Sequence, residues 1–244
     1  MTRSLVGLSP AIFVAALLST GALAADLKVT WEATGFDAPE SVIFDKDKGF
    51  IYVSNINGEA NEADGNGYLS KLSASGEVLD KQWVTGLNAP KGMALHDGRL
   101  YVSDINRLVA IDTSSGEVAA TYDAPDAKFL NDVTADEDGR VFVSDMVANS
   151  IYVLENGSFD VWLHDDALAN PNGLLAEGNR LVVGSWGVMA EDFSTEVPGH
   201  LKAIAYDTKT ISDIGSGQPI GNLDGVEADG KGGYLVTDWM AGGL

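Results

Sequence analysis

The feature that most constrains this chain is a short apolar run that recurs five times, each time ending in a small residue followed by Asn, Asp or Ser. The five runs are residues 51–55, 100–104, 141–145, 181–185 and 234–238. Their second positions lie 40 to 53 residues apart. A period of this length without helical periodicity is typical of a β-propeller, in which each repeat forms one four-stranded blade. The pattern therefore predicts an all-β propeller and excludes a solenoid of helix pairs.

Turn residues set the strand boundaries within a repeat, because Gly, Asn and Asp favour tight turns. In the third repeat the predicted strands are residues 131–136, 140–144, 150–154 and 158–162. In the second repeat they are residues 91–96, 99–103, 107–112 and 117–122. The turns at Asp97-Gly98 and Asn156-Gly157 have the two-residue chemistry of β-hairpins. Each repeat is thus expected to be a meander of four antiparallel strands.

The fifth repeat contains only its first two predicted strands before the sequence ends at Leu244. We therefore expect a propeller truncated within its fifth blade, with the C-terminal blade or blades missing. The alternative is that residues 27–31 complete an outer blade edge and close the ring differently. An open ring leaves an unpaired sheet edge, which is unfavourable.

The first residues have the pattern of a secretory signal peptide. Arg3 is followed by an apolar stretch at residues 11–18 and by small residues at Ala22 and Ala24. The stretch is too short to span a bilayer comfortably, which argues against a membrane anchor. The sequence predicts a signal peptide at residues 1–24, a propeller domain at residues 25–244, a periplasmic or secreted location, and no membrane association after cleavage.

The charge balance limits the partners. The chain has 36 acidic and 15 basic residues and a formal net charge of −21, so it repels nucleic acid and anionic lipid. It has no Cys, which excludes disulfides, thiolate nucleophiles and zinc–thiolate sites. The expected partner is a small molecule.

One position in every repeat falls at the start of the first strand, where a propeller brings its blades together at one mouth of the channel. These positions are Glu40, Lys91, Asn131, Asn172 and Asp224. Two carboxylates and two amides are oxygen donors that suit calcium, magnesium or manganese. Asn-Gly and Asp-Gly are also common turn dipeptides, but the shared register and Glu40 favour a metal site.

These segments resemble the family that includes gluconolactonase, the senescence marker protein regucalcin and luciferin-regenerating enzyme. The resemblance runs from about Ala38 onward and is carried by four motifs, Pro39-Glu40, Asn131-Asp132, Pro171-Asn172-Gly173 and Asp224-Gly225. It implies a six-bladed propeller with one divalent cation in the channel. The oxygen donors and the predicted export make calcium the first choice, with manganese, magnesium or zinc as alternatives. It also implies that Glu40, Asn131, Asn172 and Asp224 hold the metal. By the same resemblance, Asp224 is the general base, and Asn131 and Asp132 lie near the substrate.

The chain departs from this family at two places. Members that hydrolyse sugar lactones commonly have Arg two residues before the second ligand, where this chain has Phe129, and an acid just after the second strand, where it has Asn149. Both departures argue against a sugar substrate. Lys128 and Lys91 are then the candidate cations for a polar or anionic substrate oxygen, unless they are ordinary surface lysines.

The predicted function is that of an exported metal-dependent hydrolase of the lactonase type, acting on a lactone or ester. A bound cation polarises the carbonyl and activates water, so no nucleophilic side chain is required. The alternative is a non-catalytic propeller that binds a ligand or protein and carries a structural metal. Ester or phosphotriester hydrolysis at the same metal is a third reading.

Two further features remain open at this stage. The loops 55–66 and 186–199 are long, and Trp186, Met189 and Phe193 in the second loop either line a pocket or cover the top of a blade. The polar residues that end the second strands either orient metal ligands or only terminate the strands. They are Asn55, Asp104, Asp145, Ser185 and Asp238.

Overall fold

The structure is a computed structural model that describes residues 29–190 and 194–244. Residues Ala33–Leu244 form one compact unit, and the description below concerns that unit. The predicted signal peptide at residues 1–24 lies outside the described residues. None of the described residues forms a helix long and apolar enough to cross a membrane.

Four antiparallel sheets of four strands each follow one another along the chain, and a two-stranded sheet comes last. The first two sheets contain β1 (Pro39–Asp45), β2 (Phe50–Asn55), β3 (Gly67–Ser73), β4 (Val78–Leu87), β5 (Pro90–His96), β6 (Arg99–Asp104), β7 (Arg107–Asp112) and β8 (Val118–Asp123). The next two contain β9 (Leu130–Ala135), β10 (Val141–Asp145), β11 (Ser150–Glu155), β12 (Ser158–His164), β13 (Pro171–Glu177), β14 (Arg180–Ser185), β17 (Leu201–Ala205) and β18 (Ile211–Asp213). The last sheet pairs β19 (Leu223–Ala228) with β20 (Tyr234–Asp238).

Two smaller elements complete the description. A hairpin of β15 (Gly187–Met189) and β16 (Thr195–Pro198) is inserted between β14 and β17. A single 3-10 turn, η1 (Asp166–Leu168), precedes β13 and is capped by the Asp165 carboxylate, which accepts a hydrogen bond from the Ala167 N–H.

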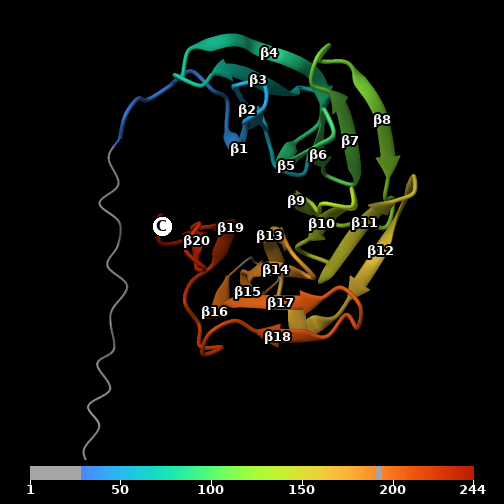
Figure 1. Cartoon of the computed structure of the whole chain (residues 1–244), viewed down its shortest axis with the longest axis vertical. Coiled ribbons are helices and arrows are strands. Elements are labelled where there is room, and N and C mark those ends of the chain that lie inside the picture. The colour runs from blue at the N-terminus through green and yellow to red at the C-terminus, as the bar shows by residue number, and fades with distance from the viewer. Residues whose placement is uncertain (1–28, 191–193) are drawn as a thin grey trace, which may run out of the picture. The chain divides into compact units, whose positions relative to one another are not determined.

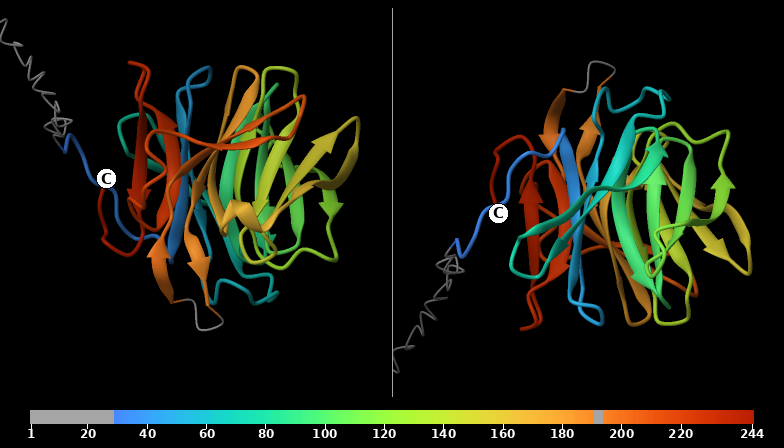
Figure 2. Two further views of the ribbon diagram at one scale, coloured as in Figure 1. Left: turned by 90° about the horizontal axis from the view of Figure 1, so that it is seen from below. Right: turned by 90° about the horizontal axis from the view of Figure 1, so that it is seen from above.

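The sheets are arranged as blades around a central channel, with the first strand of each blade innermost (Figure 1). The innermost strands are thus β1, β5, β9, β13 and β19, and the strands run between the two ends of the channel, where the loops gather (Figure 2). This confirms the prediction of an all-β propeller with four-stranded blades. Apart from the inserted β15–β16 hairpin, the described residues contain five sheets that form blades, so the count of six blades stays a prediction.

The strand boundaries in the second and third repeats agree with the predicted ones to within two residues. The turn chemistry explains this agreement. At Asp97-Gly98 and Asn156-Gly157 both residues have positive φ angles, of 46° and 72° and of 52° and 83°. Two successive positive φ values match the twist of a hairpin, and Asn, Asp and Gly adopt them at least cost.

The core lies between successive blades. Val133 on β9 packs in one cluster with Tyr101 and Leu108 of the preceding blade, and Leu174 on β13 packs with Phe142 and Ile151 of the blade before it. Burial of apolar surface between sheets is the main stabilising contribution in such an arrangement. The blade interfaces therefore fix where the first residues of the inner strands come together.

Candidate functional site

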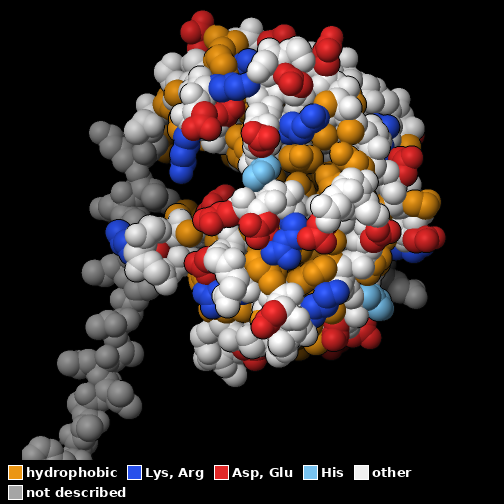
Figure 3. Space-filling model, turned by 45° about the vertical axis from the view of Figure 1, so that its right-hand side comes forward, with side chains coloured by type: hydrophobic (Ala, Val, Ile, Leu, Met, Phe, Trp, Pro, Cys, Tyr) orange, Lys and Arg blue, Asp and Glu red, His pale blue; other side chains and the backbone are white. Residues whose placement is uncertain are grey.

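The five positions predicted to converge line one cavity at one mouth of the channel. The cavity has a volume of about 570 Å³, and Glu40, Lys91, Asn131, Asn172 and Asp224 all contribute to its lining. We call these five residues the polar ring. A second cavity of about 650 Å³ shares four of them and extends along the inner strands, where Asp132 and Glu227 add further carboxylates. Acidic side chains border the hollow at the left of the space-filling view (Figure 3).

A β-bulge in every blade aims the ring residue into the channel. The pairing between the first and second strands shifts register at the ring residue in all five blades. A bulge inserts an unpaired residue, bends the strand and redirects its side chain. The residue after each ring position is Ser41, Gly92, Asp132, Gly173 or Gly225, so three of the five are glycine.

The bulge leaves a backbone N–H without a strand partner. In three blades a Ser or Thr hydroxyl on the second strand accepts a hydrogen bond from this N–H. The Ser41 N–H donates to Ser54 Oγ at 2.9 Å, and the Asp132 N–H donates to Ser144 Oγ at 2.9 Å. In the fifth blade the Gly225 N–H donates to Thr237 Oγ1 at 2.7 Å. A buried N–H without a partner is costly, which explains the small hydroxyl residue in these runs.

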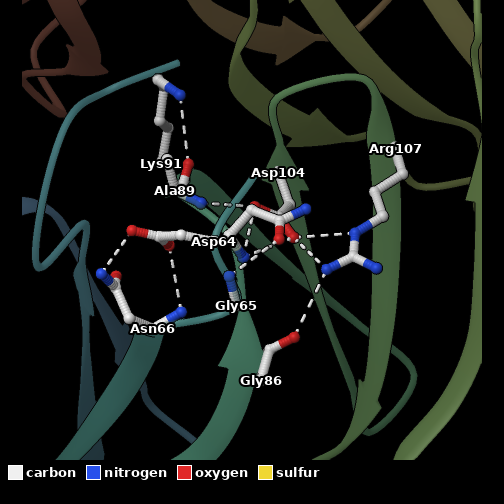
Figure 4. Close-up of polar contacts among 9 residues, drawn as sticks. Asp64, Gly65, Asn66, Gly86, Ala89, Lys91, Asp104 and Arg107 are labelled. Atoms are coloured by element: carbon white, nitrogen blue, oxygen red, sulfur yellow. Dashed lines mark hydrogen bonds and ion pairs between the residues drawn. The ribbon is translucent and has the colours of Figure 1, made fainter. Parts of the chain in front are cut away.

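The polar residue that ends the run holds the loop leading into the inner strand. Asp104 accepts hydrogen bonds from the N–H groups of Asn88 and Ala89, just before Lys91 (Figure 4). Asp145 accepts from the N–H groups of Lys128 and Phe129, just before Asn131. Both carboxylates are fully buried. Of the two readings left open by the sequence, these contacts support a positioning role, exerted through the backbone that carries the ring.

Three ring residues form a hydrogen-bonded chain. Asn131 Nδ2 donates to Asn172 Oδ1 at 2.6 Å, and Asn172 Nδ2 donates to Asp224 Oδ1 at 2.9 Å. Both asparagines are buried. The Asn131–Asn172–Asp224 chain therefore presents amide and carboxylate oxygens from three adjacent blades in one place.

Glu40 lies in the same cavity, on β1 of the first blade. Among the residues that the structure describes, none donates a hydrogen bond to its carboxyl group. Burial in the channel, together with the negative charges of Asp224 and Asp132, raises the pKa of Glu40 to about 8, and Lys91 opposes this shift. Its carboxyl is thus held in a crowded acidic environment.

Asp132 and Asp224 share this environment. Burial raises the pKa of Asp132 to about 7, although the N–H groups of Leu174 and Val133 donate to its carboxylate and act in the opposite direction. Burial also raises the pKa of Asp224, against the hydrogen bond from Asn172. Clustered, desolvated carboxylates with few positive partners favour the binding of a cation.

Lys91 is buried, and its ammonium already has partners. Its Nζ donates to the Ala60 carbonyl at 2.8 Å and to the Ala89 carbonyl at 3.1 Å, and it lies 4.4 Å from the centre of the Phe129 ring (Figure 4 shows the Ala89 contact). Burial lowers the pKa of Lys91 to about 8, with Glu40 and Asp104 opposing. The side chain thus ties the loop between β2 and β3 to the mouth, and a role in substrate binding stays a prediction.

Lys128 is placed differently. Its side chain is exposed and contributes to the lining of neither cavity, so the predicted contact with substrate has no support from the geometry. Its neighbour Phe129 lines the mouth instead. Asn149, the other departure from the family pattern, has a positive φ of 48° and donates through Nδ2 to Asp166 Oδ1, so it shapes the loop before β13.

The sequence reasoning missed an apolar position that follows the polar end of each recurring run. Ile56, Met146, Trp186 and Trp239 occupy it in four blades and all line the mouth cavity. We call these four residues the apolar rim. In the remaining blade the equivalent Ile105 forms a bridge to Leu130 instead. The signal is visible in the sequence, because every run is followed by an apolar residue.

The long loops also reach this mouth. Figure 2 shows the β15–β16 hairpin and the loop between β2 and β3 at the same end of the channel, and Met189 and Ala60 from these segments line the cavity. Phe193, the third apolar residue predicted there, lies outside the described residues. Trp186 is 8% exposed and its Nε1 donates to Thr195 Oγ1 at 2.9 Å, so it both covers the blade and lines the cavity.

The ring has oxygen donors that fit a hard divalent cation. The described part of the chain contains no group of three or more His, Cys, Asp and Glu that could hold a metal ion. The predicted set reaches four donors only because it includes two amides, and amide and carboxylate oxygens are ligands that calcium, magnesium and manganese accept. None of the three histidines lines either cavity. This donor chemistry suits zinc less well.

Comparison with known proteins identifies the fold. No protein-family model matches the sequence, and a search of curated proteins finds no match. The chain is similar to a structure of a nidogen/laminin complex, with a TM-score of 0.64 and 16% identity over 84% of this chain and 73% of that one. It is similar to virginiamycin B lyase from Staphylococcus aureus, with a TM-score of 0.56 and 17% identity over 79% of this chain and 60% of that one. It is also similar to the Cps50 (Swd1) β-propeller domain of Myceliophteria thermophila, with a TM-score of 0.60 and 12% identity over 86% and 65%.

Proposed function

We propose that this chain is a metal-dependent hydrolase of lactones or related esters, and that the polar ring is its active site. The observation that carries the proposal is the convergence of Glu40 with the Asn131–Asn172–Asp224 chain on one cavity at the channel mouth. The resemblance of the four ring segments to the gluconolactonase and regucalcin family supports it. The similarity to virginiamycin B lyase supports the fold alone.

In this proposal Glu40, Asn131, Asn172 and Asp224 hold one divalent cation, calcium first and otherwise manganese or magnesium. The cation supplies positive charge for the carbonyl oxygen and lowers the pKa of water. No nucleophilic side chain is then needed. The raised pKa values of Glu40 and Asp132 support a cation site, because they reflect burial and mutual repulsion of carboxylates, which a bound cation would relieve.

Asp224 is the proposed general base. The Asn172 amide holds Asp224 Oδ1 at 2.9 Å and thereby orients the carboxylate, leaving Oδ2 to take a proton. Burial raises the pKa of Asp224 towards neutral pH, and a general base works best when its pKa lies near the pH of the reaction. Water adds to the carbonyl carbon, the ring C–O bond breaks, and a hydroxy acid forms. The proton that water loses goes to Asp224 and returns to the leaving alkoxide.

Asn131 and Asp132 are proposed to position the substrate. Asn131 lies in the ring with its amide fixed by Asn172, and Asp132 follows it on the bulge with its carboxylate fixed by the Leu174 N–H at 2.7 Å. Fixed polar groups lower the entropic cost of reaching the transition state. The proposal includes a periplasmic or secreted location, which rests on residues 1–24 of the sequence.

The test is hydrolysis of a lactone and ester panel, followed by acid release, before and after treatment with a chelator. We expect activity that is lost on chelation, restored by calcium or manganese, and absent in Asp224→Ala. Asp160→Asn is a matched control, because Asp160 is exposed on the outer strand β12. Activity that survives in Asp224→Ala, or that is indifferent to chelation, contradicts the proposal.

A second candidate is a binding propeller with a structural cation. The observation that favours it is the exposure of Trp239 and Met240, at 62% and 69%, on the rim of the same mouth, since large exposed apolar side chains often mark an interaction site. The two candidates differ in turnover. Cation binding by the ring without hydrolysis of any member of the panel favours the binding propeller.

A further inference from the structure

The apolar rim depends on a backbone hydrogen bond that recurs in four blades. In four blades the residue after the recurring run donates its N–H to the carbonyl two residues before the ring residue. The pairs are Ile56 with Ala38 at 3.1 Å, Met146 with Phe129 at 3.1 Å, Trp186 with Asn170 at 2.9 Å, and Trp239 with Asn222 at 3.1 Å. Each bond ties the backbone of an apolar rim residue to the segment that leads into one oxygen donor of the ring. The rim is therefore part of the repeat, with the same regularity as the ring itself.

Further apolar side chains extend this wall outward. Phe129, Val147, Met189 and Met240 also line the mouth cavity. Val147 and Met240 are 43% and 69% exposed, so they are not buried as packing for the blade below. Their surfaces are free to contact a ligand, and methionine side chains adapt to ligands of different shape.

Among the described residues that line the mouth cavity, no basic side chain is left without partners. Lys91 is the basic residue in the lining, and two backbone carbonyls and the Phe129 ring already surround its ammonium. The carboxylates of Glu40 and Asp224 lie in the same cavity. The walls beyond the ring are apolar, so a charged or polyhydroxylated chain on the ligand would lose its hydration there without gaining hydrogen bonds, which is unfavourable.

We propose that the mouth cavity takes an uncharged lactone or ester with an alkyl or aryl chain, whose carbonyl reaches the polar ring while the chain lies along the apolar rim. This inference rests on the proposed function and adds the class of substrate to it. The cavity volume of about 570 Å³ is large enough for a small ring with a chain.

The kinetic test compares γ-lactones that carry methyl, butyl and hexyl chains, with glucono-δ-lactone as the polar reference. Burial of each methylene is expected to raise kcat/KM about fourfold until the chain leaves the cavity. Val147→Asp and Met240→Glu should flatten this dependence on chain length, because they place a charge where the chain binds. Val161→Asp is the matched control, since Val161 is similarly exposed, at 51%, but lies on the outer strand β12.

A binding test separates this inference from the proposed function. The 2-methyl, 2-butyl and 2-hexyl tetrahydrofurans are uncharged and cannot be hydrolysed, and their binding is followed by calorimetry and by fluorescence of Trp186 and Trp239. Affinity that rises with chain length and falls in Met240→Glu supports the apolar site even if no lactone is hydrolysed, in which case the proposed function alone fails. Equal affinity along the series, or hydrolysis that prefers glucono-δ-lactone, overturns the inference while hydrolysis itself stands.

Discussion

The inner strands meet two different environments around the channel. The residue two positions after the ring residue is Met93, Val133, Leu174 or Val226 in the last four blades, with exposures of 5%, 4%, 3% and 4%. In the first blade the equivalent Val42 is 67% exposed. Each of the four buried residues packs on the blade before it, as Val133 does on Tyr101. No described sheet packs on β1 in this way.

The last sheet shows the same contrast on the face that, in the other blades, packs on the following blade. Leu235 on β20 is 44% exposed, whereas the equivalent Tyr52, Phe142 and Val182 are fully buried against the next blade. A neighbouring blade, and not the residue type, therefore decides the burial of a repeat position. This contrast also divides the polar ring, because Asn131 and Asn172 lie in the packed arc, while Glu40 and Asp224 are on the two strands that border the open side.

The largest effect is expected from one substitution made on both sides of this comparison. Val133→Asp places an unpaired charge in a packed interface and should lower the free energy of unfolding by about 4 kcal/mol or more, or prevent folding. Val42→Asp should change it by less than about 0.5 kcal/mol. Urea unfolding of both variants is the measurement. Equal losses would show that Val42 is covered in solution and would break the comparison.

The two ring carboxylates should also differ, although both are proposed to hold the cation. Asp224→Asn removes the general base and is expected to lower kcat by about 100-fold or more. Glu40→Gln leaves the base in place and weakens only the binding of the cation. The activity that this variant loses should therefore be recovered largely by raising the cation concentration. Steady-state rates at increasing calcium concentrations distinguish the two. Recovery of Asp224→Asn by excess cation would remove Asp224 from its proposed role.

A smaller effect is expected at the hydroxyls that accept the bulge N–H. Ser144 is fully buried, and Ser144→Ala leaves the Asp132 N–H without a partner, at a cost of about 1–3 kcal/mol in unfolding free energy. The equivalent bond from Gly225 to Thr237 is exposed, so water can replace the hydroxyl and Thr237→Ala should cost less than about 1 kcal/mol. Thermal unfolding of the two variants tests this. A larger loss in Thr237→Ala would contradict the contrast between the two sides.

A dependence of stability on pH is also expected in protein freed of cations. Because the pKa of Glu40 is raised to about 8 in the folded state, the folded protein holds a proton that the unfolded chain has already released. Stability from this group is therefore present at low pH and is lost as the pH rises from about 5 to 8. Glu40→Gln should flatten the fall in melting temperature over this range, and Glu155→Gln, an exposed glutamate on β11, should not. A melting temperature that rises over the same range would contradict the acidic character of the site.

Much of this arrangement could be predicted from the sequence, because turn residues and a repeated run mark the strands directly. Asp97-Gly98 and Asn156-Gly157 placed two hairpins, and the common register placed Glu40, Asn131 and Asp224 at one mouth. The bulges could not be predicted, since nothing in a run of strand residues signals where pairing shifts. Their hydroxyl partners, such as Ser144, looked like ordinary strand ends.

Other features depend on contacts between distant parts of the chain. Lys91 looked like a free cation, and only the fold brings the Ala60 carbonyl to its ammonium. The exposure of Val42 depends on which blade lies beside β1, which no local pattern records. The apolar residue after each run can be seen in the sequence. Trp186 and Trp239 show that such a position contributes to the same site as the polar residues that end the runs.

Calorimetric titration shows most directly whether the polar ring binds one divalent cation. Calcium and then manganese are titrated into chelator-treated protein and into Asp224→Ala and Asn172→Ala, with circular dichroism to verify that each is folded. We expect binding of one cation per chain, which is lost in both variants and kept in Asp160→Asn. A folded protein that binds neither cation, or that binds them equally well without Asp224 and Asn172, would contradict it.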